Sequence, residues 1–390
     1  MEKLFILCAS IALAYQCAAM AAIIAFRLKR RARWRYAPPV SILKPVRGLD
    51  AGFGAAIRSH AMQDYPEFEI LFGVASLDDP AVPHIRRLIA EHPGRPIRLI
   101  HSTTPAPNGK AGVLIDLARE ARYGILLVND SDITVPPDYL RRVVALLRQP
   151  HCGLVTCIYR AAAGSIAGRW EAFGIAADFI PSTLVAPLVG IREFGLGSTL
   201  AFRREDLQAI GGFEAIGEYI ADDYQLAKRI TGLGKPACLS EVIVETHLSD
   251  PDWRAVWRHQ VRWARTIRVS RGDGYAGLPV TQAGLWALLC LLAGLPVYAA
   301  ALVLLRITMA LGAALTLRDP RSALLSPLAP LWDLWAFAVW VAGWTGREVE
   351  WRGGRSRLTA DGRLRPLERS VPQTARPAEP KPASHDVPVS

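Results

Sequence analysis

The feature that most constrains this 390-residue chain is an uncharged stretch near its beginning. Residues 4–26, LFILCASIALAYQCAAMAAIIAF, contain no Asp, Glu, Lys or Arg. A helix needs about 20 apolar residues to cross a bilayer. A cleaved signal peptide is the alternative, with an apolar region of about 7–15 residues that ends in a small-residue cleavage site. Because this stretch is longer and runs into RLKRRARWR, the sequence favours a retained membrane anchor.

The residues that follow the anchor are strongly basic, with six Lys and Arg residues within 27–35. The positive-inside rule places the chain downstream of them in the cytoplasm. The run is either a solvated charge cluster or a contact with anionic lipid headgroups. It supplies part of the net charge of +11 and the basic tail supplies more, so this charge does not indicate nucleic-acid binding. No helix-turn-helix, zinc-finger or RNA-binding signature supports that alternative.

From about residue 38 to 270, short apolar runs alternate with amphipathic stretches. Strands are expected at 40–43, 69–75, 97–101, 125–129 and 154–158, and helices at 80–92, 109–121 and 137–149. Strands that alternate with helices are typical of a mostly parallel sheet covered on both faces. The sequence therefore predicts an α/β domain.

The chain becomes apolar again after residue 277. Residues 278–317 form a block interrupted only by Arg306, and 324–345 form a second. The first block is either a hairpin or an interfacial helix followed by a span. Seven arginines between residues 346 and 370 favour a cytoplasmic tail and an odd number of spans, whereas a hairpin would make the number even and place the tail outside. Residues 371–390, rich in Pro, Ala and Ser, are expected to be disordered.

These patterns divide the chain into four parts. They are an anchor with its basic segment (1–36), the α/β domain (37–272), apolar transmembrane or interfacial helices (273–346) and a basic tail (347–390).

Two aspartates, Asp130 and Asp132, directly follow the apolar run ILLVN. In open α/β sheets, ligands bind beyond the carboxyl ends of the strands, and residues two apart in an extended segment point to the same side. Two adjacent carboxylates repel one another unless a cation such as Mg²⁺ or Mn²⁺ neutralises them. Such a cation can hold a diphosphate. The alternative is a polar turn, in which Asp is common.

Further carboxylates and basic side chains follow the same order along the chain. Asp78 and Asp79 come directly after a predicted strand, and Asp222 and Asp223 begin a predicted helix. Helix capping explains each pair taken alone. The stretch HQVRWARTIR (259–268) places basic and indole side chains close together, and its alternative role is packing at a membrane surface.

Taken together, these motifs resemble the inverting glycosyltransferases with a GT-A fold that modify lipids or polymerise sugars. The chain is most similar to the ceramide glucosyltransferase-like family and to its bacterial relatives in hopanoid biosynthesis. The resemblance is carried by SILKPVRGLD (41–50), DYPEFEILFGVASLDDPA (64–81), NGKAGVLIDL (108–117), NDSD (129–132), GLGSTLAFRRED (195–206), YIADDYQLAKR (219–229), HQVRWARTIR and WRGGRSRL (351–358). It implies a GT-A domain, a Rossmann-like, mostly parallel sheet between N- and C-terminal transmembrane helices.

The resemblance also implies roles for individual residues. It places Asp78 or Asp79 near the uracil and ribose of a UDP-sugar, and Lys110 near the nucleotide. Asp130 and Asp132 match the pair that binds the nucleotide and the metal, and Asp223 matches the general base, with Asp222 where many members carry Glu. Arg262 and Trp263 match the end of a (Q/R)-x-x-R-W motif. One departure is that this motif begins with His259, and Gln260 is shifted by one position. Either side chain is a candidate for that position's role.

Four further residues are weaker candidates. His247 is either a metal ligand or a structural histidine. Ser198 and Gly197 are expected to line the acceptor side with Asp222 and Trp263, where small residues permit close approach. Lys44 reaches a nucleotide phosphate or extends along the surface.

The expected activity is sugar transfer from a UDP-sugar to a membrane lipid, with Mg²⁺ or Mn²⁺. Inversion needs a base for the acceptor hydroxyl and positive charge for the departing diphosphate. Asp223, Arg262 and the metal supply these. The resemblance implies N-acetylglucosamine as the sugar, the polyol tail of a hopanoid (bacteriohopanetetrol) as the acceptor, and a multi-pass protein of the bacterial inner membrane with a cytoplasmic catalytic domain.

Other activities stay open. UDP-glucose:ceramide glucosyltransferase is the nearest alternative, because the shared motifs handle nucleotide and catalysis rather than the acceptor. A processive polysaccharide synthase is the second, although three or four spans are few for a secretion pore. A non-catalytic membrane scaffold is the third. A glycosidase also pairs carboxylates but needs no diphosphate clamp.

Overall fold

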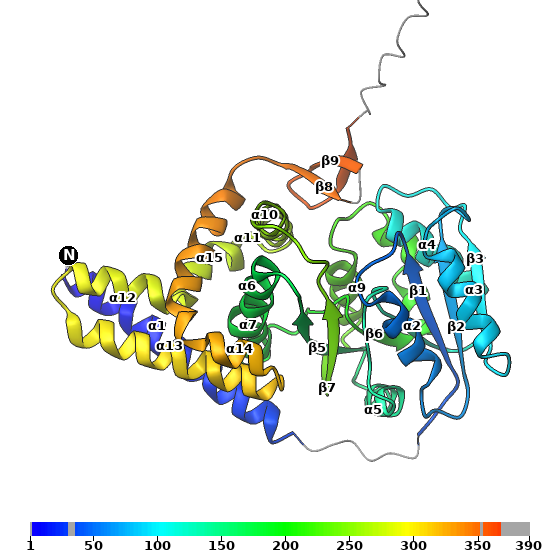
Figure 1. Cartoon of the computed structure of the whole chain (residues 1–390), viewed down its shortest axis with the longest axis horizontal. Coiled ribbons are helices and arrows are strands. Elements are labelled where there is room, and N and C mark those ends of the chain that lie inside the picture. Colours follow the sequence, from blue (N-terminus) through cyan, green and yellow to red (C-terminus); the bar gives the residue numbers. More distant parts are fainter. Residues whose placement is uncertain (1, 30–35, 352–353, 368–390) are drawn as a thin grey trace, which may run out of the picture.

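The computed structural model describes residues 2–29, 36–351 and 354–367. Most of the basic run after the anchor, and the tail at 371–390 for which disorder was predicted, lie outside the described residues. The main part of the chain is an α/β domain built on one seven-stranded sheet (Figure 1). The strands are β1 (Val40–Val46), β2 (Phe68–Val74), β3 (Ile97–His101), β4 (Ile125–Val128), β5 (Leu154–Ala162), β6 (Leu200–Arg203) and β7 (Ala237–His247).

The sheet is mostly parallel, as the sequence predicted. Its strand order is β3-β2-β1-β4-β6-β5-β7, and only β6 runs antiparallel to its neighbours. All five predicted strands are present. The reversed strand β6 and the long edge strand β7 were not predicted, because β6 follows the glycine-containing stretch GLGST and β7 is interrupted by adjacent polar residues such as Ser240 and Glu241.

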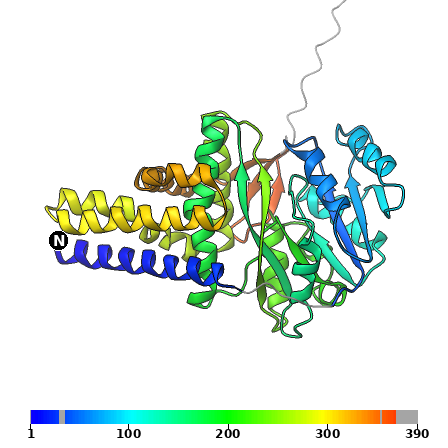
Figure 2. The ribbon, with the colours of Figure 1, turned by 60° about the horizontal axis from the view of Figure 1, so that its bottom comes forward.

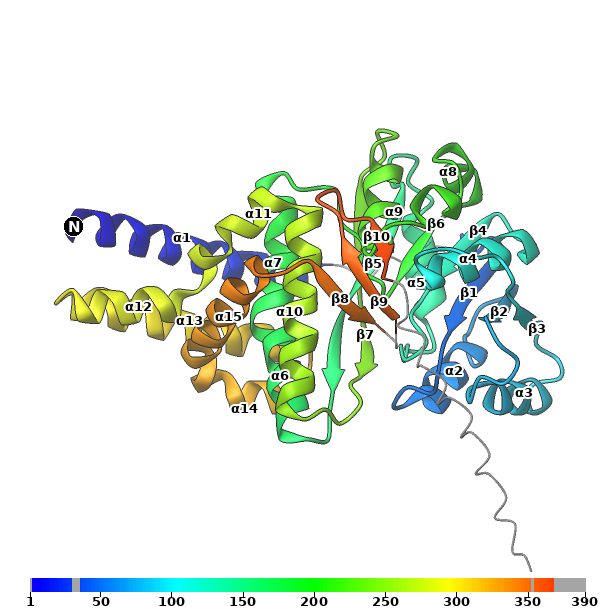
Figure 3. The same cartoon turned by 90° about the horizontal axis from the view of Figure 1, so that it is seen from above.

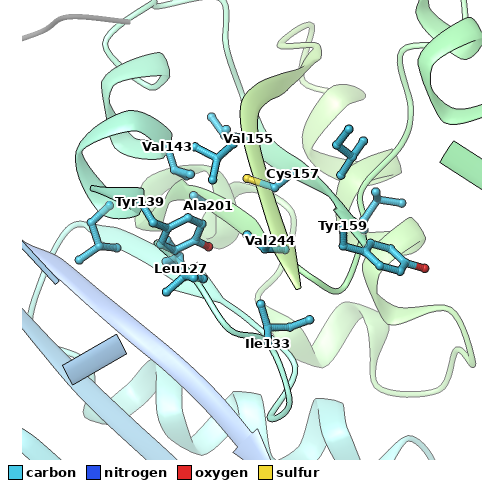
Figure 4. Packing of buried hydrophobic residues seen from close by; sticks show 14 of the residues in the cluster. Leu127, Ile133, Tyr139, Val143, Val155, Cys157, Tyr159, Ala201 and Val244 are labelled. Carbon is cyan, nitrogen blue, oxygen red and sulfur yellow. The ribbon is translucent and has the colours of Figure 1, made fainter. Parts of the chain in front are cut away.

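Helices cover both faces of the sheet because its strands present apolar side chains to both. In β1, Ile42 belongs to one hydrophobic cluster with α2 and α3, and Leu43 belongs to a second with α4. Figure 4 shows the first cluster between the sheet and α5, with Leu127, Val155, Ala201 and Val244 packed near Tyr139 and Val143. The helices are α2 (Phe53–Ala61), α3 (Val82–Glu91), α4 (Gly109–Glu120), α5 (Tyr139–Leu146), α8 (Arg204–Ala209), the 3₁₀ turn η3 (Phe213–Ile216) and α9 (Asp222–Thr231).

An apolar helix that the sequence analysis did not predict lies beside the sheet. It consists of α6 (Ile166–Gly174), the π-helical turn η1 (Ile175–Phe179), α7 (Ile180–Val185) and η2 (Ala186–Val189). By length and composition it could span a membrane, yet 61% of its window is buried inside the protein. It runs alongside α10 (Trp253–Ser270) and across the direction of α1 (Glu2–Arg27), as Figures 2 and 3 show. Its position indicates a layer between the sheet and the remaining apolar helices.

Three apolar helices project away from the sheet as a bundle (Figures 1 and 2). They are α1, α12 (Ala283–Leu292) and α13 (Pro296–Thr316), and the turn between α12 and α13 lies at the same end as the N-terminus. In the described residues four helices are long and apolar enough to span a membrane, or five if the bent pair at Gly272–Leu292 is counted. The block at 278–317 is therefore a hairpin whose first arm, α12, is short.

Helix α15 (Ala329–Trp344) crosses the base of this bundle and holds it to the domain (Figure 1). The charged residue in the apolar block, Arg306 of α13, is fully buried and paired with Asp333 of α15, with Nη2 to Oδ1 at 2.7 Å. Its Nη1 also donates to the carbonyl of Ala177 in η1 at 2.7 Å. A buried charge needs such partners because its desolvation is costly. The remaining helices are α11 (Gly272–Gly277), η4 (Leu278–Thr281), α14 (Pro320–Leu325) and η5 (Ser326–Leu328).

The chain after α15 returns to the α/β domain. A three-stranded antiparallel sheet is formed by β8 (Glu348–Trp351), β9 (Gly354–Leu358) and β10 (Leu364–Pro366). Leu364 donates a backbone hydrogen bond to Glu218 at 2.7 Å, and Ile220 donates one to Gly362 at 3.1 Å. This part of the tail therefore lies on the domain's side of the bundle. The number of spans and the side of the membrane on which the tail lies stay predictions.

Candidate active site

Polar residues from distant parts of the chain meet where β4 ends. Asp130 and Asp132 follow β4, Lys110 lies in the first turn of α4, and Asp222 and Asp223 begin α9. The amide of Asn108 caps α4 by accepting hydrogen bonds from the N–H groups of Lys110 and Ala111. This cap fixes the first turn of α4, and with it the starting point of the Lys110 side chain.

Lys110 links the two pairs of aspartates. Its Nζ lies 2.7 Å from Asp130 Oδ1 and 3.0 Å from Asp222 Oδ2. Burial alone would lower the pKa of Lys110, but the charges of Asp130 and Asp222 outweigh burial and raise it. The lysine therefore stays protonated and reduces the repulsion among the carboxylates. The two motifs, 92 residues apart, thus belong to one site.

Asp223 is held by backbone donors. Its Oδ2 accepts from the N–H of Gly197 at 3.1 Å, and its Oδ1 accepts from the N–H of Tyr224 at 2.7 Å. Burial and the charge of Asp222 raise the pKa of Asp223 to about 6. A carboxylate with this pKa is ionised at neutral pH and is a stronger base than an exposed aspartate.

Asp132 is buried more deeply than Asp130. Its Oδ2 accepts a hydrogen bond from Thr246 Oγ1 of β7. Burial and the charge of Asp130 raise the pKa of Asp132, and Asp50 adds to the effect. Because like charges so close together raise the energy of the ionised pair, these carboxylates form a donor set that fits a hard divalent cation.

His247 does not complete a three-ligand metal site with these aspartates. No three His, Cys, Asp or Glu side chains in the described part of the chain are arranged to hold a metal ion. Nε2 of His247 lies 3.3 Å from Glu245 Oε1, its Nδ1 is buried without a partner, and its ring packs against Gly52. A cation at Asp130 and Asp132 would therefore need oxygen ligands from a substrate.

Lys44 does not extend along the surface, because its side chain is fully buried in β1. Its Nζ donates to the backbone carbonyl of Asp130 at 3.0 Å. Burial lowers the pKa of Lys44 to about 7, although Asp132 and Asp130 oppose this. The Lys44 side chain thus holds the backbone of Asp130 in place from inside the sheet.

The two aspartates after β2 have different surroundings. Asp79 accepts from the N–H of Gly48 at 2.8 Å and from that of Ala81 at 2.9 Å, so it joins two loops. The carboxylate of Asp78 is exposed and forms no hydrogen bond with the described residues. Asp78 is therefore the one of the pair that is available to a ligand.

Helix α10 carries the second group of candidate residues and forms one wall of a cavity. The ring of Trp263 packs on Phe179 of η1 with ring centroids 5.8 Å apart, and on His259 at 4.8 Å. A cavity of about 590 Å³ lies between α10 and strands β8 and β9. His259 and Arg262 line it, together with Arg258, Arg265 and Arg355. Gln260 does not line it. This wall is basic, in contrast to the acidic sheet edge.

For Ser198 the structure differs from the sequence prediction, and Glu171 was not predicted to belong to the site. Ser198, expected on the acceptor side, is buried and donates to the carbonyl of Cys157 at 2.9 Å, which indicates support of the loop. Glu171 of α6 is buried and contacts both His259 and Gln260. The apolar stretch 166–189 is uncharged apart from Arg169, Glu171 and Asp178, and an acid at such a position was the signal that could have identified Glu171.

The fold and the grouping of these motifs define a GT-A-like domain that carries apolar helices at both ends. Among solved structures, a mannosyltransferase from Pyrobaculum calidifontis in complex with GDP-Man and Mn²⁺ is similar, with a TM-score of 0.50 and 20% sequence identity. The match covers 86% of this chain and 97% of that one. At this identity the likeness shows the fold.

The sequence profile described as Glycosyl transferase family 21 matches residues 4–364. The chain therefore belongs to glycosyl transferase family 21.

Curated relatives have names that refer to lipid substrates. Ceramide glucosyltransferase 1 of Caenorhabditis elegans is 29% identical over 206 residues, which cover 52% of this chain and 44% of that protein. Beta-monoglucosyldiacylglycerol synthase of Synechocystis is 25% identical over 242 residues, covering 58% of this chain and 47% of that protein. The matched regions thus span less than half of the length of these relatives.

Proposed function

We propose that this chain is an inverting glycosyltransferase that moves a sugar from a UDP-sugar to a hydroxyl group of a membrane lipid. The observation that carries the proposal is the network in which Lys110 joins Asp130 to Asp222, with Asp223 beside it. Membership of family 21 and the lipid-linked names of the relatives support the lipid acceptor.

In the proposed reaction, Asp223 takes the proton of the acceptor hydroxyl. The acceptor oxygen then forms a bond to the anomeric carbon of the sugar, and the bond between that carbon and the diphosphate breaks. UDP leaves with the electron pair of that bond. The raised pKa of Asp223 suits this role, since a base is most effective when its pKa lies near the working pH.

The leaving diphosphate needs positive charge. Arg262, on the wall formed by α10, supplies a guanidinium that can form paired hydrogen bonds with phosphate oxygens. Asp130 and Asp132 would hold Mg²⁺ or Mn²⁺, which screens the charge that develops on a departing diphosphate. Asp78 is the aspartate available to the nucleoside, because Asp79 is engaged with two loops.

The arrangement of the helices suits an acceptor that stays in a membrane. Trp263 of α10 and Phe179 of η1 form an aromatic contact between α10 and the layer of α6 and α7. Bundle helices expose large apolar side chains, among them Leu292 and Val297, which are 76% and 79% exposed. Such surfaces are typical of contact with lipid. We expect the domain to lie on the cytoplasmic side of a bacterial inner membrane.

For the acceptor we favour the polyol tail of a hopanoid, and for the sugar N-acetylglucosamine. This choice rests on the sequence resemblance described above. The relatives favour ceramide with glucose as the second candidate, and diacylglycerol glycosides as a related one. In all of them the reacting group is a hydroxyl at the membrane surface.

In the test, purified protein in detergent with Mg²⁺ or Mn²⁺ is incubated with each of a panel of UDP-sugars. The acceptors are three lipids: bacteriohopanetetrol, ceramide and diacylglycerol. Lipid products are identified by mass spectrometry, and UDP release is measured separately. The matched control is Asp223→Asn, which keeps the shape of the side chain but cannot accept the proton.

A hexosamine-sized mass gain on the hopanoid alone would establish the favoured acceptor. A hexose gain on ceramide or diacylglycerol would retain lipid glycosylation and replace the acceptor, and a polymeric product would indicate a processive synthase. No UDP release with any sugar, in protein that remains folded, would overturn the proposed activity.

A further inference from the structure

Glu171 is a buried carboxylate on which two neighbouring residues of α10 converge. Nδ1 of His259 lies 2.5 Å from Glu171 Oε1, and Nε2 of Gln260 donates to the same oxygen at 3.0 Å. Only 3% of the Glu171 side chain is exposed. Among the described residues His259 is the one basic side chain within 4 Å of this carboxylate, so α6 and α10 are joined here by one acidic group.

This contact fixes which ring nitrogen of His259 is left for a ligand. Glu171 as a carboxylate can only accept hydrogen bonds, so Nδ1 of His259 carries the proton. In the neutral ring Nε2 then holds a lone pair. Trp263 packs on the ring at a centroid distance of 4.8 Å and further limits its rotation.

The same contact distinguishes His259 from Gln260. His259 lines the cavity beside Arg262, whereas Gln260 does not. The amide N–H of Gln260 is engaged by Glu171. These contacts favour His259 over Gln260 for the first position of the H-Q-x-R-W stretch.

We infer that Glu171 is a positioning residue, which holds His259 so that Nε2 accepts a hydrogen bond from a substrate hydroxyl in the cavity between α10 and β8–β9. Gln260 completes the support of Glu171 and does not meet the substrate. The inference rests on the proposed function for the identity of the substrate. The proton arrangement of the Glu171–His259 pair does not depend on it.

The test is a double-mutant cycle on kcat and KM with UDP-sugar and lipid. We expect Glu171→Gln, which keeps one acceptor oxygen, to lower kcat/KM on the order of tenfold, and Glu171→Met, which keeps the volume, to lower it further. In a His259→Gln background the same changes at Glu171 should alter kcat/KM less than about twofold, because a positioning residue acts only through its partner. The matched control is Glu205→Gln, an exposed glutamate on α8.

Equal losses from Glu171→Gln in both backgrounds would overturn the inference and indicate a merely structural carboxylate. A Gln260→Ala variant with a larger loss than His259→Gln would overturn the assignment of His259. The melting temperature of each variant identifies any that fail to fold.

A second readout is independent of activity. In protein labelled with ¹⁵N-histidine, the His259 signal is assigned by its loss in His259→Gln. We expect an Nδ1-protonated ring in the wild type and a shift towards the Nε2-protonated tautomer in Glu171→Met. An unchanged tautomer would overturn the inference, whereas the expected shift in a protein that releases no UDP would mean that only the proposed function fails.

Discussion

Gly197 holds Asp223 in place: its backbone N–H donates a hydrogen bond of 3.1 Å to Asp223 Oδ2. The carbonyl of the same glycine accepts from the N–H of Asp130 at 3.1 Å. One residue without a side chain thus connects the proposed base to the aspartate after β4. A Cβ at Gly197 would lie 2.7 Å from Asp130 Oδ2, so a larger residue would displace the Asp130 carboxylate.

Replacing this glycine should separate the two groups. We expect Gly197→Ala to lower kcat by at least tenfold and to destabilise the protein by about 1–3 kcal/mol, the usual cost of forcing a methyl group into a packed site. Steady-state kinetics and thermal unfolding measure the two effects. The control is Gly54→Ala in α2, where a Cβ meets nothing within 4 Å. Equal behaviour of the two variants would contradict the role of Gly197.

Removal of the positive charge between the aspartates should expose their repulsion. We expect Lys110→Met to destabilise the protein by about 3 kcal/mol, because Asp130 and Asp222 lose their buried partner. Added Mn²⁺ should restore part of the melting temperature in this variant. Lys228→Met, at an exposed position on α9, is the control. A Lys110→Met protein with the melting temperature of the wild type would contradict the account.

The raised pKa of Asp223 predicts opposite effects on activity and stability. Its pKa is about 6 in the folded protein and about 3.9 in an unfolded chain. As the pH falls through about 6 the folded state takes up the proton first, so activity should decrease while the stability linked to this group increases. At pH 7.5 the ionised group is a net cost. We therefore expect Asp223→Asn to reduce kcat by at least a hundredfold and to raise the free energy of unfolding by about 1–3 kcal/mol.

The measurements for Asp223 are a pH–rate profile and denaturant unfolding at pH 5 and 7.5. The stability gain of Asp223→Asn should be about half as large at pH 5 as at pH 7.5, because the carboxyl of the unfolded chain, with a pKa of about 3.9, is still ionised at pH 5. A gain of the same size at both pH values would mean that another property of the amide is responsible.

The buried pair Arg306–Asp333 should matter for the attachment of α13 to α15. We expect Arg306→Met alone to destabilise the protein by about 3–5 kcal/mol, since it leaves Asp333 buried without its partner. The double variant Arg306→Met with Asp333→Leu should recover much of this loss, because no isolated charge remains. Thermal unfolding in detergent compares the three proteins. A double variant less stable than Arg306→Met would show that the pair contributes more than it costs in desolvation.

The strands β8–β10 should support the loop that leads to Asp222 and Asp223. Leu364 packs in one apolar cluster with Ile220 and Ala221. We expect Leu364→Asp to lower activity by about tenfold or more while the apolar bundle stays folded, since burying an unpaired charge there is costly. Kinetics and tryptophan fluorescence report the two parts. Arg365→Ala, at the adjacent exposed position, should leave both unchanged.

Local sequence patterns were enough to predict the strands β1 to β5, the helices α3, α4 and α5 and the apolar ends of the chain, whereas α2 was not predicted. These predictions succeed because strand and helix periodicities are properties of neighbouring residues, and a bilayer requires a minimum apolar length. The motifs that resemble family 21 also identified the residues that converge at the end of β4. The short reversed strand β6 and the layer of α6 and α7 escaped notice, because neither carries a periodicity that distinguishes it from the surrounding apolar sequence.

Only the tertiary structure decided how the predicted residues divide their roles. His259 and Glu171 are 88 residues apart, and no local pattern relates them. Tertiary contacts also brought His247 to Glu245, buried Lys44 and Ser198, and left Asp78 exposed while engaging Asp79. The sequence by itself determined which chemical groups and apolar lengths are available. Which of them meet depends on long-range packing, since a hydrogen bond or an ion pair forms only where the fold brings two groups within about 3 Å.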